Sequence, residues 1–374
     1  MKIQFLELAN FRNHTSTKLE FSEGINLITG PNGVGKTNII DAIHYVCMSK
    51  SFVASSDSYV VKQGESEFAI KVQIEGEIRK NFELSCTWKR GEGKAFEVNE
   101  SQLDRLSDLI GIVPVVVLSP DDRKITNEGP VERRSFLDAM ISQVSKNYLL
   151  SLMDYRKVVR QRNSLLSFGI RSRSELESLL EPWDAQLIKI GTSIIIKRME
   201  VLKLFADYLK KGYRKISGIN LTPNFVYKTI VGEPDTTENI ATRYAELILE
   251  NREREIEREM TLVGPHRDEL VFYLDDMELR KFGSQGQHRL FALSLKLAEL
   301  HYFNDVLDDL PVFLLDDVFG DLDPSKIEVL TEMLAEHPGQ SFVTAANEAP
   351  FSGLISYESG RNKRFSVSQG PLIS

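Results

Sequence analysis

The feature that most constrains this 374-residue chain is a glycine-rich loop near its N-terminus. The loop lies between an apolar stretch of strand length, residues 25–29, and a segment, 37–48, whose apolar residues recur at helical spacing. It matches the pattern Gly-x-x-x-x-Gly-Lys-[Ser/Thr] of phosphate-binding loops at every position. The residues of the loop are Gly30, Pro31, Asn32, Gly33, Val34, Gly35, Lys36 and Thr37. Strand, loop and helix in this order are the arrangement that a phosphate site requires.

Each part of this loop has a chemical role. The glycines allow backbone N–H groups to point at phosphate oxygens together with the N-terminus of the following helix. We expect Lys36 to neutralise the outer phosphates and Thr37 to reach a magnesium ion. A purely structural turn is the alternative, but the complete match between a strand and a helix favours binding of ATP or GTP with Mg²⁺.

A second motif is a pair of carboxylates at the end of an apolar strand, residues 312–315. Buried strands avoid acidic residues unless a metal ion or a proton transfer requires them. We expect Asp316 to hold the magnesium ion together with Thr37, and Asp317, on the opposite side of the strand, to orient the attacking water as a general base. A helix cap is the alternative for this motif taken alone.

A third motif precedes an amphipathic helix expected at about residues 288–303. A serine hydroxyl and free N–H groups at a helix N-terminus can form a second anion site. An ordinary helix cap explains the same residues equally well, but their position shortly before the Asp316 strand favours the anion site. The motif consists of Ser284, Gln285, Gly286 and Gln287.

Charge and composition restrict the partners. With 46 Lys and Arg against 54 Asp and Glu, the net charge of −8 argues against a protein that coats nucleic acid by bulk electrostatics, so any DNA contact must be local. Cys47 and Cys86 fit buried thiols, and no apolar run approaches the ~20 residues of a membrane helix, so we expect a cytoplasmic protein. On charge density alone, the residues favoured as DNA contacts are Arg133, Arg134, Arg156, Arg160 and Arg162. The alternative is that these arginines form an ordinary solvent-exposed surface.

The residue pattern that indicates secondary structure changes twice along the chain. Residues 1–130 are strand-rich, 131–220 have long helical segments with breaks near Gly169 and Pro182, and 221–374 return to mixed patterns. We therefore expect the N-terminal half of a nucleotide-binding core, an inserted helical lobe, and the C-terminal half of the core.

The three motifs occur in the order found in ABC-type ATPases of the SMC class, and within that class the chain resembles the RecF family. The resemblance implies an α/β fold, with an ABC-type ATPase head built on a mixed sheet and a phosphate loop, plus an inserted helical lobe. Further matching segments are residues 10–13 (Asn-Phe-Arg-Asn), 118–122 (Leu-Ser-Pro-Asp-Asp), 161–163 (Gln-Arg-Asn), 264–268 (Gly-Pro-His-Arg-Asp) and 320–323 (Gly-Asp-Leu-Asp).

The resemblance also carries expectations about function. It implies that Arg12 and Asn38 contribute to ATP binding, that Asp323 acts in the loop after the paired carboxylates, and that residues 284–287 meet the nucleotide of a second chain. It implies a slow, DNA-stimulated ATPase that dimerises on ATP and acts as a switch in recombinational repair and replication-fork maintenance. Such a protein binds single-stranded and gapped or linear double-stranded DNA and helps load recombinase with RecO and RecR.

Two departures from the usual pattern concern hydrolysis. The strand 341–344 is followed by Ala345, Ala346 and Asn347, without the histidine that many ABC ATPases use to sense the γ-phosphate, and Thr344 is our candidate substitute. Asp317 stands where a glutamate is commoner, and its shorter reach predicts slow hydrolysis. His266 is interpreted as a turn residue after Gly264 and Pro265.

Two other functions remain open at this point. An ATPase subunit of an SbcC-like nuclease complex would need long coiled-coil arms, and the apolar positions of the helical lobe persist for only a few heptads. A transporter-type ATPase would not need so large an inserted lobe.

Overall fold

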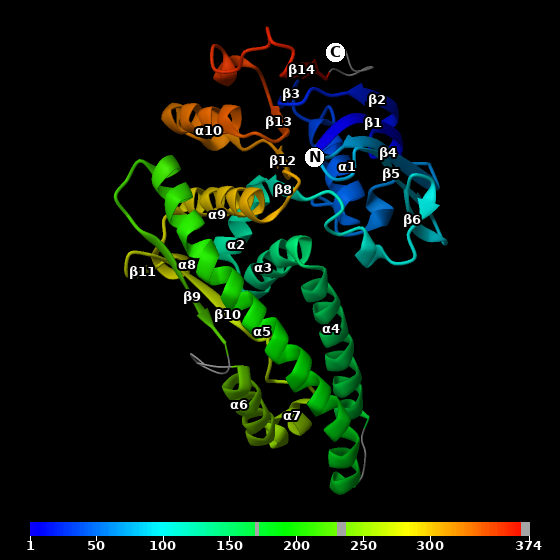
Figure 1. Cartoon of the computed structure of the whole chain (residues 1–374), viewed down its shortest axis with the longest axis vertical. Coiled ribbons are helices and arrows are strands. Elements are labelled where there is room, and N and C mark those ends of the chain that lie inside the picture. The colour runs from blue at the N-terminus through cyan, green and yellow to red at the C-terminus, as the bar shows by residue number, and fades with distance from the viewer. Residues whose placement is uncertain (169–171, 230–236, 368–374) are drawn as a thin grey trace. The chain divides into compact units, whose positions relative to one another are not determined.

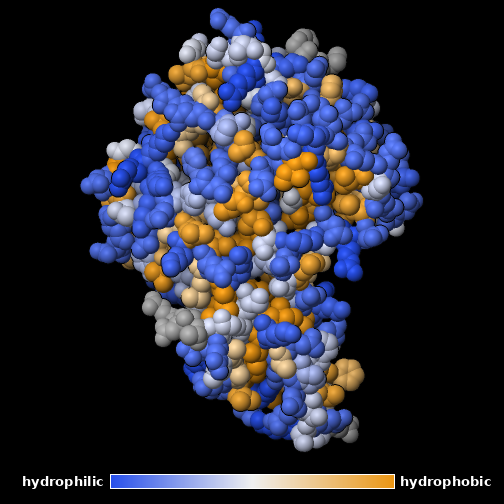
Figure 2. Space-filling model, in the orientation of Figure 1, coloured by the Kyte–Doolittle hydropathy of each residue, from blue (hydrophilic) through white to orange (hydrophobic). Residues whose placement is uncertain are grey.

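The computed structural model describes residues 1–168, 172–229 and 237–367 (Figure 1). The chain divides into two compact units. The first contains residues 1–123, 211–220 and the chain from 292 onward, and the second contains 124–210 and 221–291. Within the described residues, no helix is both long enough and apolar enough to cross a membrane. The face of the molecule in Figure 2 is mostly hydrophilic, with hydrophobic residues scattered among the hydrophilic ones.

The first unit contains a parallel five-stranded sheet. The order of its strands is β14 (Lys363–Ser366), β3 (Ile25–Thr29), β13 (Ser341–Ala345), β12 (Val312–Leu315) and β8 (Val115–Leu118). Every residue of β12 and β13 is buried, which explains the continuous apolar sequence of β12, whereas β13 also buries Ser341 and Thr344. Because parallel strands end at the same edge of a sheet, the phosphate loop after β3 and the paired carboxylates after β12 are brought to one edge, with β13 between them.

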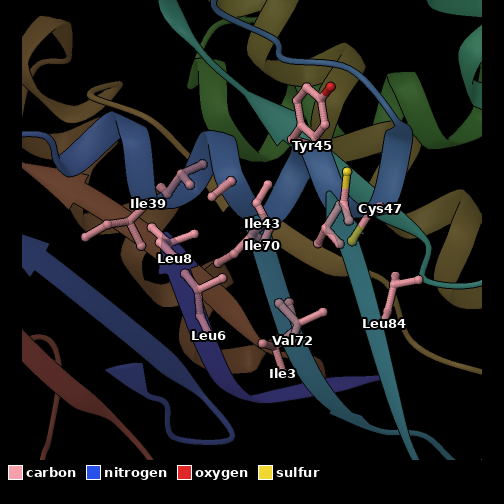
Figure 3. Close-up of a cluster of buried hydrophobic side chains, with 14 of the residues drawn as sticks. Ile3, Leu6, Leu8, Ile39, Ile43, Tyr45, Cys47, Ile70, Val72 and Leu84 are labelled. Atoms are coloured by element: carbon pink, nitrogen blue, oxygen red, sulfur yellow. The ribbon is translucent and has the colours of Figure 1, made fainter. Parts of the chain in front are cut away.

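An antiparallel six-stranded sheet completes the sheet structure of this unit. In order it contains β2 (His14–Glu20), β1 (Lys2–Phe11), β4 (Glu67–Glu75), β5 (Asn81–Lys89), β6 (Gly93–Val98) and β7 (Ser101–Gln102). Helix α1 (Lys36–Met48) packs on β1 and β4, and Figure 3 shows Ile39 and Ile43 of the helix gathered with Leu8 and Ile70 of these strands. Cys47 and Cys86 are buried free thiols, as predicted.

The remaining elements of the first unit are short, apart from α10 and most of α9. Their bounds are η1 (Asp57–Tyr59), η2 (Leu106–Asp108), η3 (Pro120–Asp122), α9 (Gln285–Val306), η4 (Phe319–Asp321), α10 (Pro324–Glu336) and η5 (Ala349–Phe351).

The second unit is mainly helical and carries one small antiparallel sheet. Its helices are α2 (Arg123–Asn127), α3 (Pro130–Val144), α4 (Lys146–Ser167), most of α5 (Arg173–Ser217), α6 (Thr237–Glu250), α7 (Arg252–Arg258) and α8 (Leu279–Phe282). The strands of the sheet, in order, are β11 (Met277–Glu278), β10 (Glu269–Leu274) and β9 (Pro223–Lys228).

The two units differ from the predicted arrangement in two respects. Residues 221–291, predicted to belong to the second half of the core, cluster with the helical segment instead, since β10 contacts α3 and α4 contacts α7. The predicted break at Pro182 is wrong, because Pro182 lies inside the 45-residue helix α5. Leu180 and Leu187 are buried on either side of the exposed proline, so packing holds one helix through a residue that disfavours it. The other predicted break, at Gly169, lies outside the described residues.

Arg198 on α5 is the centre of a buried polar network in the second unit. Its Nη2 donates to Asp138 Oδ1 at 2.8 Å, its Nη1 to Asp268 Oδ2 at 3.2 Å and to the Pro265 carbonyl at 2.7 Å, and its Nε to the Tyr148 hydroxyl at 3.0 Å. A buried guanidinium is costly unless its N–H donors have partners, and here the partners come from several elements. The network therefore joins α3, α4 and α5 to the loop before β10.

The segment 264–268 therefore has a structural role. The Tyr155 hydroxyl donates to His266 Nδ1 at 2.8 Å, and His266 Nε2 donates to the Thr261 carbonyl at 3.1 Å. Burial lowers the pKa of His266 to about 4, which keeps the ring neutral, as this pattern requires. A Cβ on Gly264, whose φ is +133°, would lie 2.0 Å from the Tyr155 hydroxyl and 2.1 Å from that of Tyr244. A side chain is thus excluded at this glycine.

We predict that Gly264→Ala lowers the free energy of unfolding by about 2 kcal/mol or more, because the methyl group overlaps both tyrosine hydroxyls at an unfavourable φ. Gly218→Ala is the control, since Gly218 also has a positive φ, +65°, but no atom lies within 4 Å of the added Cβ. It should cost only about 1 kcal/mol. Urea unfolding measures both, and equal losses would contradict the packing argument.

Candidate nucleotide-binding site

The glycine-rich loop after β3 has the backbone that its sequence predicts. Gly30, Gly33 and Gly35 have φ values of 150°, 84° and 106°. A Cβ on Gly30 would lie 2.2 Å from the Val367 carbonyl, and one on Gly35 would lie 2.5 Å from the Asn13 amide, so neither position has space for a side chain. Lys36, at the start of α1, donates from Nζ to the carbonyl oxygens of Gly30 at 2.7 Å and of Pro31 at 2.9 Å. The ammonium group therefore lies inside the curve of the loop.

Asp316, directly after β12, is joined to this loop by hydrogen bonds. Its Oδ1 accepts from Thr37 Oγ1 at 2.8 Å and from Thr344 Oγ1 at 2.7 Å. Burial raises the pKa of Asp316 above its ordinary value, and the hydrogen bonds from Thr344 and Thr37 oppose this shift. The two hydroxyl groups thus stabilise the ionised form of Asp316, whereas its burial favours the neutral form.

Asp317 lies on the exposed side of the same strand end. Its φ of 48° is in the left-handed region, and its backbone N–H donates to Thr344 Oγ1 at 2.9 Å. It contributes to a pocket of about 290 Å³, which we call the loop pocket. The residues that line the loop pocket are Asn13, Asn32, Gly33, Gly35, Lys36, Thr37, Asn38 and Asp317.

The donor set fits a magnesium ion held jointly with a nucleotide. Among the described residues, no group of three or more His, Cys, Asp or Glu is arranged to hold a metal ion. Thr37 and Asp316 supply two oxygen atoms at one point, and Mg²⁺ bound with phosphates commonly takes only one or two protein ligands. Phosphate oxygens and water would complete the coordination.

Asn13 belongs to the site, although the sequence alone gave it no role there. Its Nδ2 donates to the Val34 carbonyl at 2.9 Å, and its Oδ1 accepts from Asn38 Nδ2 at 2.7 Å. Asn13 thus joins the turn between β1 and β2 to both the loop and α1. The sequence feature that could have indicated this role is the segment 10–13, which was noticed only because it matches the RecF family.

Arg12, expected to bind ATP, points to the second turn of α1. Its Nη2 donates to Asp41 Oδ2 at 2.8 Å and to Ser51 Oγ at 3.1 Å, and Asp41 is fully buried. Arg12 does not line the loop pocket, whereas Asn38 does. A direct role of Arg12 in ATP binding stays a prediction.

The residues 284–287 form a reciprocal helix cap at the start of α9. The backbone N–H of Ser284 donates to Gln287 Oε1 at 2.8 Å, and the N–H of Gln287 donates to Ser284 Oγ at 3.3 Å. This is the cap that the sequence left open as an alternative. Gln285 and Gly286 complete the exposed turn, and their function toward a second chain stays a prediction.

Asp323 precedes α10 and lies at its N-cap position. Its Oδ2 accepts from Lys326 Nζ at 2.7 Å, and its side chain is exposed. Its expected function in an assembly of two chains is likewise a prediction.

Comparison with known proteins places this site in a family. The family model "RecF/RecN/SMC N terminal domain" matches residues 2–357. The "DNA replication and repair protein RecF" of Salinibacter ruber is 41% identical over 375 residues, which cover 99% of this chain and 91% of that protein. The chain belongs to the RecF family. The protein of the same description from Chloroherpeton thalassium is 38% identical, with 96% of this chain and 99% of that protein covered.

Solved RecF structures share the fold over the whole chain. "Structure of the recombination mediator protein RecF-ATP in RecFOR pathway" matches with a TM-score of 0.90 and 31% identity, covering 100% of this chain and 97% of that one. The Smc head domain from Pyrococcus furiosus matches with a TM-score of 0.57 at 16% identity and so supports the fold alone. The predicted ABC-type ATPase fold is confirmed.

The predicted DNA cluster of this RecF-family chain does not form a single surface. Arg162 is fully buried, where Nε donates to Asp184 at 2.7 Å and Nη2 to Glu255 at 2.5 Å. Arg133 is only 2% exposed and pairs with Glu269. These two residues are therefore not available to DNA.

The other members of the cluster are more accessible. Arg134 is partly exposed and donates to the Asp268 carbonyl at 2.8 Å. Arg156 and Arg160 are exposed on α4, where Arg156 keeps a 3.4 Å ion pair with Asp138. Charge density alone misled the prediction. Arg162 follows the buried positions Tyr155 and Val158 at helical spacing, a signal that placed it on the buried face of α4.

Proposed function

We propose that this chain is an ATP-hydrolysing DNA replication and repair protein that uses ATP as a switch. The observation that carries the proposal is the convergence of Lys36, Thr37, Asp316 and Asp317 at one edge of the parallel sheet. The relatives described as DNA replication and repair proteins and the RecF structure whose description names ATP support it.

In this proposal the loop binds and orients the phosphates of ATP. The backbone N–H groups and Lys36 face the phosphates, as in other phosphate loops. Thr37 and Asp316 would hold Mg²⁺, which neutralises charge that develops on the phosphate oxygens. Asp317 accepts a proton from the attacking water, and its short side chain makes hydrolysis slow enough for a timing step.

We further propose that two copies close around two nucleotides. The exposed turn formed by Ser284 and Gly286 of one copy would meet the nucleotide in the loop pocket of the other. Closure would present a DNA-binding surface, DNA would stimulate hydrolysis, and hydrolysis would release the DNA. Proteins of the RecR and RecO kind are the proposed partners at gapped, single-stranded or linear duplex DNA, as the description "RecFOR pathway" of a related structure suggests.

For the DNA surface we now favour the exposed face of α4. Arg156 and Arg160 lie on it with Lys157, and all three are exposed. Phosphate contacts by such residues add affinity without sequence preference. An overall acidic protein would then bind DNA through one local basic face.

We predict that the double substitution Arg156→Glu and Arg160→Glu weakens DNA binding by about 10-fold or more at moderate salt. It should also reduce the slope of log affinity against log salt by about 2, because two phosphate contacts are lost. Fluorescence anisotropy with gapped duplex, in the presence of an ATP analogue, measures both quantities.

The matched control is Arg243→Glu with Arg254→Glu, which makes the same charge change at Arg243 of α6, whose side chain is 42% exposed, and at the exposed Arg254 of α7. It should leave the slope unchanged. Equal effects of the two pairs would assign the loss to total charge, and parent-like binding by the α4 variant would remove this face from the proposal.

The shared active site has a separate test by complementation. Lys36→Met inactivates the phosphate loop of the chain that carries it. Ser284→Arg disrupts the turn that this chain would present to a second copy, so each variant should be inactive alone. In a mixed dimer, one site combines the sound loop of the Ser284→Arg chain with the sound turn of the Lys36→Met chain. We predict that mixing restores a measurable part of the ATPase activity.

The control mixes the Lys36→Met chain with a chain that carries both substitutions, because that pair has no intact site and should stay inactive. Heterodimer formation with an ATP analogue is followed by size-exclusion chromatography. Heterodimers without recovered activity would contradict the shared site, and full ATP-dependent dimerisation by Ser284→Arg alone would contradict the role of this turn.

A further inference from the structure

Thr344 is a buried hydroxyl between the two halves of the candidate site. It lies near the end of β13, the strand between β3 and β12, and its side chain is fully buried. Its Oγ1 donates to Asp316 Oδ1 at 2.7 Å and accepts from the Asp317 backbone N–H at 2.9 Å. One hydroxyl group therefore contacts a side chain of one carboxylate residue and the backbone of the next.

These contacts use the hydroxyl in both directions. A threonine hydroxyl has a single hydrogen to donate, and here Asp316 receives it. Thr344 also does not line the loop pocket. A direct contact with the γ-phosphate, which the sequence suggested, would require Thr344 to give up its bond to the carboxylate and to leave its buried position.

The second contact restrains an unfavourable backbone. Asp317 has a φ of 48°, which lies in the left-handed region that is unfavourable for a non-glycine residue. Such conformations persist when surrounding groups fix them. The bond from its N–H to Thr344 fixes the peptide at the point where the chain leaves β12 and turns the Asp317 side chain toward the loop pocket.

We propose that Thr344 is a positioning residue for both carboxylates. It holds Asp316 in the orientation in which Thr37 and Asp316 meet, and it holds the backbone from which Asp317 reaches the attacking water. Thr344 acts through these two residues and does not touch the nucleotide. The expected effect on ATP hydrolysis rests on the proposed function. The hydrogen bonds of Thr344 can be tested without it.

The test compares Thr344→Val, which has nearly the same shape but no hydroxyl, with Thr344→Ser, which keeps the hydroxyl. The first measurement is amide hydrogen exchange of nucleotide-free protein in peptides that cover residues 312–320. The Val variant should exchange faster at Asp317 than the parent, and the Ser variant should match the parent. Unchanged exchange in the Val variant would overturn the proposal, and matching thermal unfolding would show that both variants fold.

The second measurement is binding of a fluorescent ATP analogue and of its ADP counterpart, with Mg²⁺ titrated and with Mg²⁺ removed by EDTA. The Val variant should need about 10-fold to 100-fold more Mg²⁺ for tight ATP binding. Its preference for ATP over ADP in EDTA should equal that of the parent. Loss of this preference in EDTA, with an unchanged Mg²⁺ requirement, would instead identify Thr344 as a γ-phosphate sensor.

The third measurement separates kcat from KM. At saturating Mg²⁺ and ATP the Val variant should lose about 10-fold or more in kcat, with rescue by Ser, because the Asp317 backbone stays unrestrained. An unchanged kcat would overturn the Asp317 part of the proposal. If the parent itself fails to hydrolyse ATP, the proposed function fails, whereas hydrogen exchange and Mg²⁺-dependent binding still decide the role of Thr344.

Discussion

One carboxylate oxygen joins the parts of this site. Asp316 Oδ1 accepts hydrogen bonds from Thr37 of the phosphate loop and from Thr344 of β13. A carboxylate at the end of a buried parallel strand is costly unless it is hydrogen-bonded or binds a metal ion, and burial does raise the pKa of Asp316. The bonds that offset this cost also fix the loop, the metal ligand and the strand between them in one arrangement.

This convergence follows from the order of the strands. Because β13 lies between β3 and β12, its last residues separate the loop from the paired carboxylates by one strand, a distance that a threonine hydroxyl can bridge. The second unit is stabilised differently. Its core contains matched ions such as Arg198 with Asp138, and the segment 264–268, which the sequence marked only as a match to the RecF family, is a structural junction there.

The sequence predicted those features that depend on local chemistry. The loop, the helix after it and the strand before Asp316 follow from residue pattern and spacing, and they were found within a residue or two of the predicted bounds. It could not predict features set by distant packing. Pro182 continues a helix because leucines on both sides are buried, and Asn13 reaches the loop only because β1 and α1 pack together.

Arginines illustrate the same limit. Arg133 and Arg162 have the charge expected of a DNA contact, but their carboxylate partners are far along the chain, Glu269 for the first and Glu255 for the second. No local sequence pattern indicates pairs between residues so far apart. The helical spacing of the apolar residues in α4 would, however, have indicated that Arg162 lies on its buried face. Charge density is therefore informative only after the buried face of a helix has been assigned.

We propose that Asp317 is the general base of a site assembled around Asp316. The most direct measurement is single-turnover ATP hydrolysis by Asp317→Asn, together with ATP affinity in the presence of Mg²⁺. We expect a rate at least about 100-fold lower, because a general base contributes about 10²-fold to 10⁴-fold to the rate. The affinity for ATP should be unchanged, because the loop and Asp316 are intact. Hydrolysis at the parent rate would contradict the proposal and would show that another group activates the water.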